Sequence, residues 1–248
     1  MVAFLRGKRT LLRLRGKYLR LKSSILLPVM AIGVSPFIMQ STESLVSISF
    51  NSSLKAYGGD TYVGAMTIAS SVMQVATMPL HGIAQGAQPI VGFNSGAGNF
   101  DRVKRAFRLL LTSCVVFTCV IWAAVELFPD VFIALFNDKP ALVEVARRTL
   151  RVYMAGIFAF GVQSACQQTF VALGQAKVSL FLALLRKIIL LIPLIFILPR
   201  FLPDKIFAVW LSEPIADVLA ATTTGCMFAW QFPKILSRRE QELNHSET

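Results

Sequence analysis

Six long apolar runs divide the chain, separated by short segments that contain glycine, proline or charge. A transmembrane helix needs about 20 apolar residues, and Gly, Pro and charged clusters are typical of the connections between helices. The pattern therefore predicts an all-α integral membrane protein with six transmembrane helices forming one bundle. We expect the helices near residues 25–51, 61–95, 105–127, 149–171, 178–199 and 206–231.

Polar residues form stripes on several of these helices. On the first and second, they recur at spacings of three and four, which places them on one helical face. A lipid-facing amide has no hydrogen-bond partner, so such stripes are expected to face helix neighbours or a solvated cavity. The side chains predicted to line a cavity are Gln40, Ser47, Gln74, Met78, His81, Gln85, Gln88, Asn94, Gln163 and Gln167. Gln163 and Gln167 on the fourth helix could equally bond across to a neighbouring helix.

The second helix is longer than a bilayer requires and contains Pro79 and Pro89. Proline removes a backbone donor and kinks helices, so we expect bends at both positions. Its second half, residues 82–99, is rich in glycine and amides, and small residues let helix backbones approach closely. This segment is therefore predicted to line a passage.

Glu43 lies at the centre of the first stripe. An ionised carboxylate in mid-membrane costs about 3 kcal/mol on insertion scales, so it needs a partner, a cation or water. Glu43 is therefore a candidate site for coupling H⁺ or Na⁺ movement to transport. The alternative is an interhelical hydrogen-bonding residue with no role in transport.

Two further acids, Glu213 and Asp217, lie four residues apart on the sixth helix. Like charges at this spacing repel unless a basic group or cation is close, and Arg186 and Lys187 on the fifth helix are the available bases. Because intramembrane charges usually pair with one another, we expect an ion pair of Arg186 with Glu213 and Asp217.

Composition excludes an ordinary soluble domain. Of 248 residues, 55% are hydrophobic and 15% charged, and 25 Lys and Arg against 13 Asp and Glu give a net charge of +12. Eight of the basic residues precede the first apolar run, where juxtamembrane Lys and Arg indicate the cytoplasmic side or anionic lipid rather than nucleic acid. Residues 1–24 are therefore interpreted as a basic cytoplasmic linker, residues 25–231 as the bundle and residues 232–248 as a cytoplasmic tail.

The basic residues also predict an orientation. With both termini in the cytoplasm, sixteen lie inside and seven outside, which follows the positive-inside rule for a cell (inner) membrane protein. Three of the seven cluster at one outer helix end and run against the rule: Arg147, Arg148 and Arg151.

Nothing in the sequence indicates an enzyme. There is no phosphate-binding loop of the GxxxxGK type, no Ser, His and Asp set and no metal-ligand cluster. The four cysteines lie in apolar stretches without a CxxC pair, as small buried residues do. We expect no metal and no cofactor.

One long motif resembles a known family. Residues 85–97, followed by Asn99 and by Arg102 and Val103, are similar to the signature of the multidrug and toxic compound extrusion (MATE) transporters. Shorter matches lie at residues 35–40, 57–60, 172–175 and 213–217, in the order of the C-terminal six-helix half of that family.

The resemblance implies one lobe of a twelve-helix transporter that exchanges H⁺ or Na⁺ for organic, often cationic, compounds by alternating access. Its partners would be the lipid bilayer, drug-like substrates and a separate N-terminal six-helix lobe. Family members with a cation-site glutamate carry it close to the position of Glu43. Two alternatives are a non-transporting half-size protein or subunit and a lipid-linked-sugar flippase, which would need a strongly basic cavity.

Overall fold

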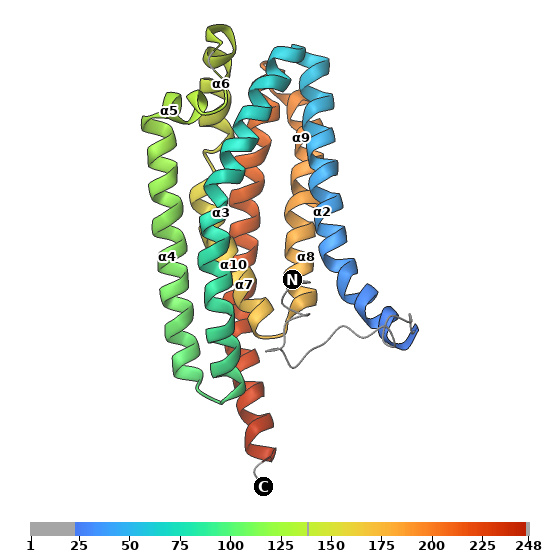
Figure 1. Ribbon diagram of the computed structural model, residues 1–248, viewed down its shortest axis with the longest axis vertical. Coiled ribbons are helices and arrows are strands. Elements are labelled where there is room, and N and C mark those ends of the chain that lie inside the picture. Colours follow the sequence, from blue (N-terminus) through green and yellow to red (C-terminus); the bar gives the residue numbers. More distant parts are fainter. Residues whose placement is uncertain (1–22, 138, 247–248) are drawn as a thin grey trace, which may run out of the picture. The chain divides into compact units, whose positions relative to one another are not determined.

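Every regular element in the described part of the chain is a helix, which confirms the all-α membrane fold (Figure 1). The computed structural model describes residues 23–137 and 139–246. The helices are α2 (Ser23–Gly58), α3 (Asp60–Gly96), α4 (Phe100–Leu127), α5 (Pro129–Ala134), α6 (Pro140–Tyr153), α7 (Ile157–Ala172), α8 (Ala176–Leu184), the π-helical segment η2 (Leu185–Leu191), α9 (Ile192–Phe201) and α10 (Lys205–Ser246).

The chain divides into two compact units at Gln40, and the packing described below is that of the second, from Ser41 onwards. The first unit includes the described beginning of α2. The predicted basic linker, residues 1–24, lies outside the described residues except for its last two positions.

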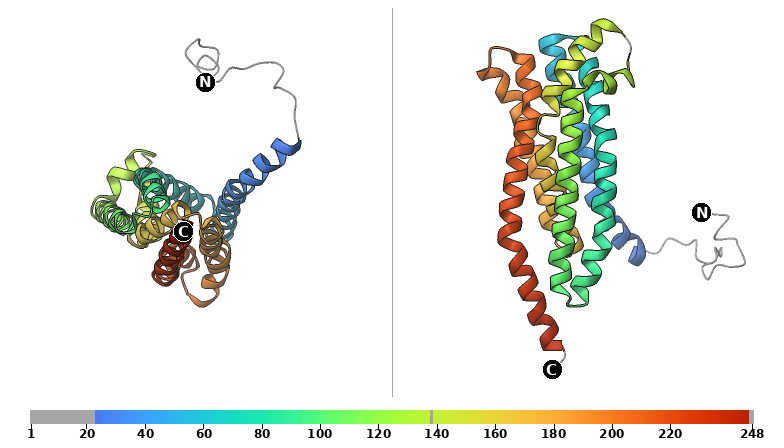
Figure 2. Two further views of the ribbon diagram at one scale, coloured as in Figure 1. Left: turned by 90° about the horizontal axis from the view of Figure 1, so that it is seen from below. Right: turned by 90° about the vertical axis from the view of Figure 1, so that its left-hand side faces the viewer.

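Within the second unit, successive long helices run up and down the bundle (Figures 1 and 2). The connections after α2, α4 and α9 lie at one end, and those after α3 and α7 lie at the other. We call the first the α5 end and the second the α8 end. α3 packs against α4, α6 and α7, and α10 packs against α6, α7, η2 and α9. The loops therefore alternate between the two ends, as a multi-pass membrane protein requires.

Four segments of the described chain are long and apolar enough to cross a membrane: residues 60–96, 100–127, 177–201 and 205–242. They correspond to the second, third, fifth and sixth predicted spans. The fourth prediction, residues 149–171, was wrong as one continuous helix, because α6 ends at Tyr153 and α7 begins at Ile157.

The break between α6 and α7 lies at a close helix crossing. A Cβ atom on Gly156 would lie 2.6 Å from the Cα of Pro214 on α10. Only glycine fits at that separation, so the start of α7 lies directly against α10, beside Asp217 of the sixth predicted span. The break therefore shortens α7 to 16 residues.

The fifth predicted span contains a π-helical segment in its middle. Its last residue is followed by Ile192, whose N–H donates to the carbonyl of Lys187, five residues earlier. Pro193 has no N–H and its ring clashes with the carbonyl four residues before it, which a wider turn accommodates. π-bulges are frequent at functional sites, and this one carries Arg186 and Lys187.

α3 agrees with the second predicted span to within one residue at each end and continues through Pro79 and Pro89, where the expected bends stay a prediction. One other helix differs from expectation. α10 continues past residue 231 to Ser246, because residues such as Arg238 and Glu242 form helix well and pair four residues apart.

The three arginines that oppose the positive-inside rule all have acidic partners at the α5 end. Arg147 bonds Asp130 at 2.8 Å, Arg148 bonds Asp204 at 3.3 Å, and Arg151 lies 3.9 Å from Glu126. The hydrogen bond with Asp130 raises the pKa of Arg147 above its ordinary value. This end therefore carries less net positive charge than its arginines suggest.

Candidate functional site

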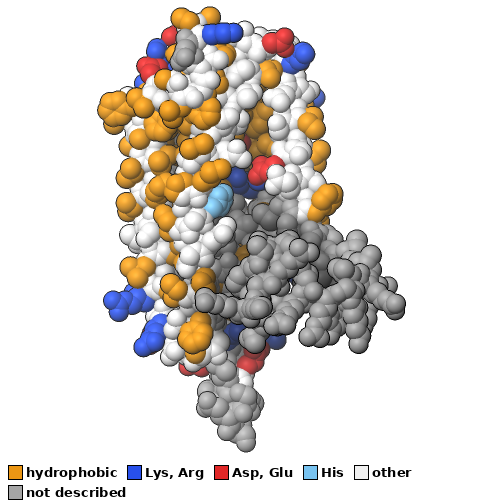
Figure 3. Space-filling view, viewed as in Figure 1, with side chains coloured by type: hydrophobic (Ala, Val, Ile, Leu, Met, Phe, Trp, Pro, Cys, Tyr) orange, Lys and Arg blue, Asp and Glu red, His pale blue; other side chains and the backbone are white. Residues whose placement is uncertain are grey.

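The polar stripes of α2 and α3 lie on an exposed face of the second unit. On α2, Glu43, Ser47 and Asn51 are exposed. On α3, the exposed members are Gln74, Met78, His81 and Gln85, and the stripe becomes half-buried at Gln88. Acidic, basic and histidine side chains gather halfway along this face (Figure 3). Gln40 is also exposed but belongs to the first unit.

Glu43 is paired with Lys187 of η2. The Lys187 ammonium contacts the Glu43 carboxylate, so this carboxylate has a cationic partner within the bundle. The Glu43 side chain keeps 54% of its surface exposed and that of Lys187 keeps 16%. The pair therefore lies at the boundary between the bundle interior and the exposed face.

Arg186, the neighbour of Lys187, points into the bundle. Its Nε donates to Oδ1 of Asp217 at 2.7 Å, and its Nη2 donates to Oε1 of Glu213 at 2.7 Å. All three side chains are less than 10% exposed. The second oxygens of both acids, Oε2 of Glu213 and Oδ2 of Asp217, are buried without a hydrogen-bond partner. One cation thus holds two carboxylates.

Phe160 of α7 contacts both Arg186 and His81. The Arg186 guanidinium lies over its ring, 4.8 Å from the centroid. On α3, the exposed His81 meets the same ring edge-on, with 6.5 Å between centroids. An Arg on an aromatic face gains cation–π attraction, so Phe160 helps to hold Arg186 in place.

The fourth-span amides lie at least partly inside the bundle. Gln163 is only 1% exposed, and its place in a cavity lining stays a prediction. Gln167 is half-buried and donates to the carbonyl of Ser179 on α8 at 3.2 Å. On α3, Asn94 donates to the carbonyl of Ile90 in its own helix. Among the described residues, only Gln167 of these three amides is seen to bond to a neighbouring helix, and the buried Oε1 of Gln163 has no hydrogen-bond partner.

Sequence reasoning missed the Glu43–Lys187 pair. Successive residues on a helix point about 100° apart, so Arg186 and Lys187 cannot both face α10. That geometry was a usable signal for assigning Lys187 to a different helix. Among the described residues, no group of three His, Cys, Asp or Glu side chains is placed to hold a metal ion.

Comparison with known proteins gives relatives at 22–25% identity. Multidrug export protein MepA of Staphylococcus aureus (strain NCTC 8325 / PS 47) is 25% identical over 194 residues, which are 77% of this chain and 42% of that protein. MepA of Staphylococcus saprophyticus is 22% identical over 198 residues, 80% of this chain and 43% of that protein. The chain spans 34–43% of the length of these two proteins and of a relative from Mycoplasma pneumoniae.

Solved structures show the same fold. The inward-facing conformation of a multidrug resistance MATE family transporter matches with a TM-score of 0.84 at 18% identity, covering 94% of this chain and 54% of that one. The MATE multidrug transporter DinF-BH, solved in complex with R6G, matches with a TM-score of 0.71 at 33% identity, covering 89% of this chain and 49% of that one. The fold corresponds to a C-terminal-like half of such a transporter.

The family model agrees with both comparisons. It matches residues 36–197, which include the polar stripes of α2 and α3, the α7 amides and both basic residues of η2. Membrane-length helices, the half-transporter fold and this match lead to one conclusion: the chain belongs to the MatE family of membrane-embedded MATE transporters.

Proposed function

We propose that this chain is the C-terminal lobe of a secondary active multidrug efflux antiporter of the cell (inner) membrane, with both termini in the cytoplasm. It would act with a six-helix N-terminal lobe, present in the same polypeptide or supplied separately. The coupling ion would be H⁺ or Na⁺, and the substrates would be organic, often cationic, compounds of the kind that the names of its relatives indicate.

The exposed polar face of α2 and α3 is the observation that carries this proposal. Exposed amides and a charged pair midway along membrane-length helices are unfavourable against acyl chains, which offer no hydrogen bonds. A second lobe and the water of a shared cavity would satisfy them. Alternating access by rocking one bundle against another around such a cavity is a general transporter mechanism.

The Glu43–Lys187 pair supports a mechanism that couples movement of the cation to transport of the substrate. A proton or Na⁺ that binds Glu43 competes with the Lys187 ammonium for the same carboxylate. Releasing Lys187 frees a positive charge at the edge of the cavity, where it repels a cationic substrate. Binding of the coupling ion therefore disfavours binding of the cationic substrate, as antiport requires.

Glu43→Gln tests this coupling. The amide keeps the shape of the side chain but cannot bind a proton or Na⁺ as a carboxylate does. With the chain expressed beside the N-terminal lobe of a MATE relative, we expect ethidium efflux under imposed H⁺ or Na⁺ gradients to fall at least about tenfold, because the driving ion loses its site.

Lys187→Met is the matched counterpart, since it removes the competitor and leaves the acid. It should raise the apparent affinity for the coupling ion, so that half-maximal efflux needs a smaller gradient. Cation-driven efflux that is unchanged in Glu43→Gln would reject the coupling role. An absence of efflux from the unaltered chain expressed beside the N-terminal lobe would favour a non-transporting half-size protein.

The flippase alternative gains no support from the basic residues of the bundle. Arg186 and Lys187 both face carboxylates, so neither offers an uncompensated charge for a lipid phosphate. The drug-transport proposal therefore fits these residues better.

A further inference from the structure

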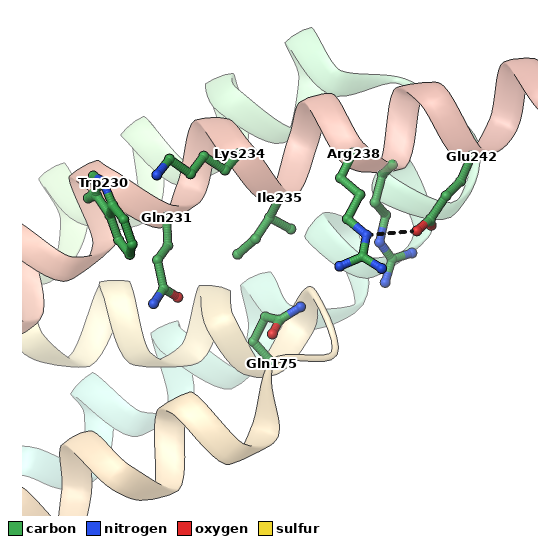
Figure 4. A pocket seen from close by; sticks show the side chains of 8 residues that line it. Gln175, Trp230, Gln231, Lys234, Ile235, Arg238 and Glu242 are labelled. Carbon is green, nitrogen blue, oxygen red and sulfur yellow. Dashed lines mark hydrogen bonds and ion pairs between the residues drawn. The ribbon is translucent and has the colours of Figure 1, made fainter.

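A second charged site lies far from the polar face, at the α8 end of α10. It is an open pocket of about 500 Å³ between the last turns of α10 and the α7–α8 connection (Figure 4). Lys234, Arg238 and Glu242 come from α10, and Gln175 lies opposite them on the connection. The remaining lining residues are Trp230, Gln231, Ile235 and Arg239.

The pocket lies where α10 changes from apolar to charged. Lys234 is the first charged residue after Asp217, and the intervening stretch belongs to the apolar part of the helix. Trp230 is 62% exposed just before this change. Trp at the end of an apolar span, followed by Lys and Arg, is typical of the level of the lipid headgroups.

The three basic side chains line the same pocket but have different partners. The Lys234 ammonium folds back over the Trp230 ring, 3.6 Å from its centroid, which holds it toward the apolar side. Arg239 is fixed by donating to the carbonyl of Leu173 at the end of α7, at 3.1 Å. A guanidinium has five N–H donors, so this bond orients Arg239 without exhausting its donors.

The lining carries net positive charge. Glu242 opposes the three cations and lies 3.2 Å from Arg238, but both of these side chains are largely exposed. A single carboxylate therefore leaves the lining with an excess of two positive charges. A phosphate diester, with its one negative charge, would offset part of this excess, and exposed Trp230 would contact the apolar part of the same molecule.

We propose that this pocket binds the headgroup of an anionic glycerophospholipid, with Lys234 and Arg238 on the phosphate and Trp230 against the upper acyl chain. A soluble phosphate compound would use the basic residues but would leave the exposed ring of Trp230 without an apolar contact. The combination of aromatic ring and cations at the headgroup level favours the lipid.

Trp230 provides the probe for a direct test. The full chain is reconstituted in phosphatidylcholine vesicles that contain either brominated phosphatidylglycerol or an equal amount of brominated phosphatidylcholine. Bromine quenches nearby tryptophan, and subtracting the signal of Trp230→Phe isolates this residue from the other two tryptophans. We expect stronger quenching by the anionic lipid.

The double variant Lys234→Ala/Arg238→Ala should reduce this lipid preference at least about fivefold, since each basic residue near a membrane surface contributes a factor of about that size. Both side chains are exposed, so their truncation removes no core packing. The matched control is Arg102→Ala/Arg105→Ala, which removes the same charge from exposed positions at the start of α4, at the same end of the bundle. The control should keep the preference.

Three results would overturn the proposal. Equal quenching by the two lipids would show no headgroup site, and an equal loss in the control would show only general surface charge. If soluble glycerol phosphate abolished the preference, the pocket would be a site for free phosphate compounds instead.

Discussion

Arg186→Met is expected to destabilise the protein more than any other single change at the candidate site. Methionine fills similar space but leaves Glu213 and Asp217 buried and without their cation. Removing one partner of a buried ion pair costs about 3–5 kcal/mol, because the remaining charge has lost both water and its partner. We expect the temperature at which half of the detergent-solubilised protein loses its monodisperse peak to fall by about 10 °C.

The adjacent residue supplies the matched control. Lys187→Met removes the same charge from the next position, but Glu43 remains about half exposed, so its cost should be below about 1 kcal/mol. The triple variant Arg186→Met/Glu213→Gln/Asp217→Asn should recover most of the loss, since neutral groups replace all three charges. If the triple variant melts as low as Arg186→Met, the buried charges are not the cause.

The spacing of acids and bases predicted this cluster in part. Glu213 and Asp217 share a helix face because four residues make about one turn, and two such acids need a base. Helix geometry also implies that Arg186 and Lys187 cannot both face α10, but it does not say which of them does. That choice depends on the π-helical turn and on which helix lies beside each side chain, and both are properties of the assembled bundle.

Helix existence was predictable from hydrophobic runs, whereas helix ends and breaks were not. The sequence around Gly156 does not distinguish it from the other glycines of apolar runs. Only its contact with Pro214 shows why α6 ends and α7 begins there. The end of α10 was placed too early because the run becomes polar near Lys234. Helix formation continues past that point, since Arg, Glu and Gln favour helix as well as Leu does.

The exposed polar face and the interior of the bundle differ in how much space surrounds each residue. The glycines of the apolar helices divide into two groups according to the space around the position that a Cβ atom would take. Gly82 and Gly86 on α3 have open space where a Cβ would be, but Gly161 on α7 does not.

Gly161→Ala is expected to force α7 away from α4. The added Cβ would lie 2.4 Å from Oγ1 of Thr118 and 2.8 Å from the carbonyl oxygen of Cys114. Real Cβ contacts are not that short, and the Cys114 oxygen belongs to a helix backbone that cannot turn aside. Overpacking of this kind costs about 1–3 kcal/mol, so the melting temperature should fall by several degrees, despite alanine's better helix propensity.

Gly225→Ala is the control that changes helix propensity without causing a steric clash. On α10, the added Cβ would meet Val162 at 3.9 Å, an ordinary contact, so this variant should melt at or above the temperature of the parent protein. Thr118→Ala combined with Gly161→Ala should recover only part of the loss, because the backbone oxygen of Cys114 remains and the hydroxyl's bonds to Cys114 and Phe158 disappear. Equal melting temperatures for Gly161→Ala and Gly225→Ala would contradict a close α4–α7 contact, since only one of them places a methyl group against a neighbouring backbone.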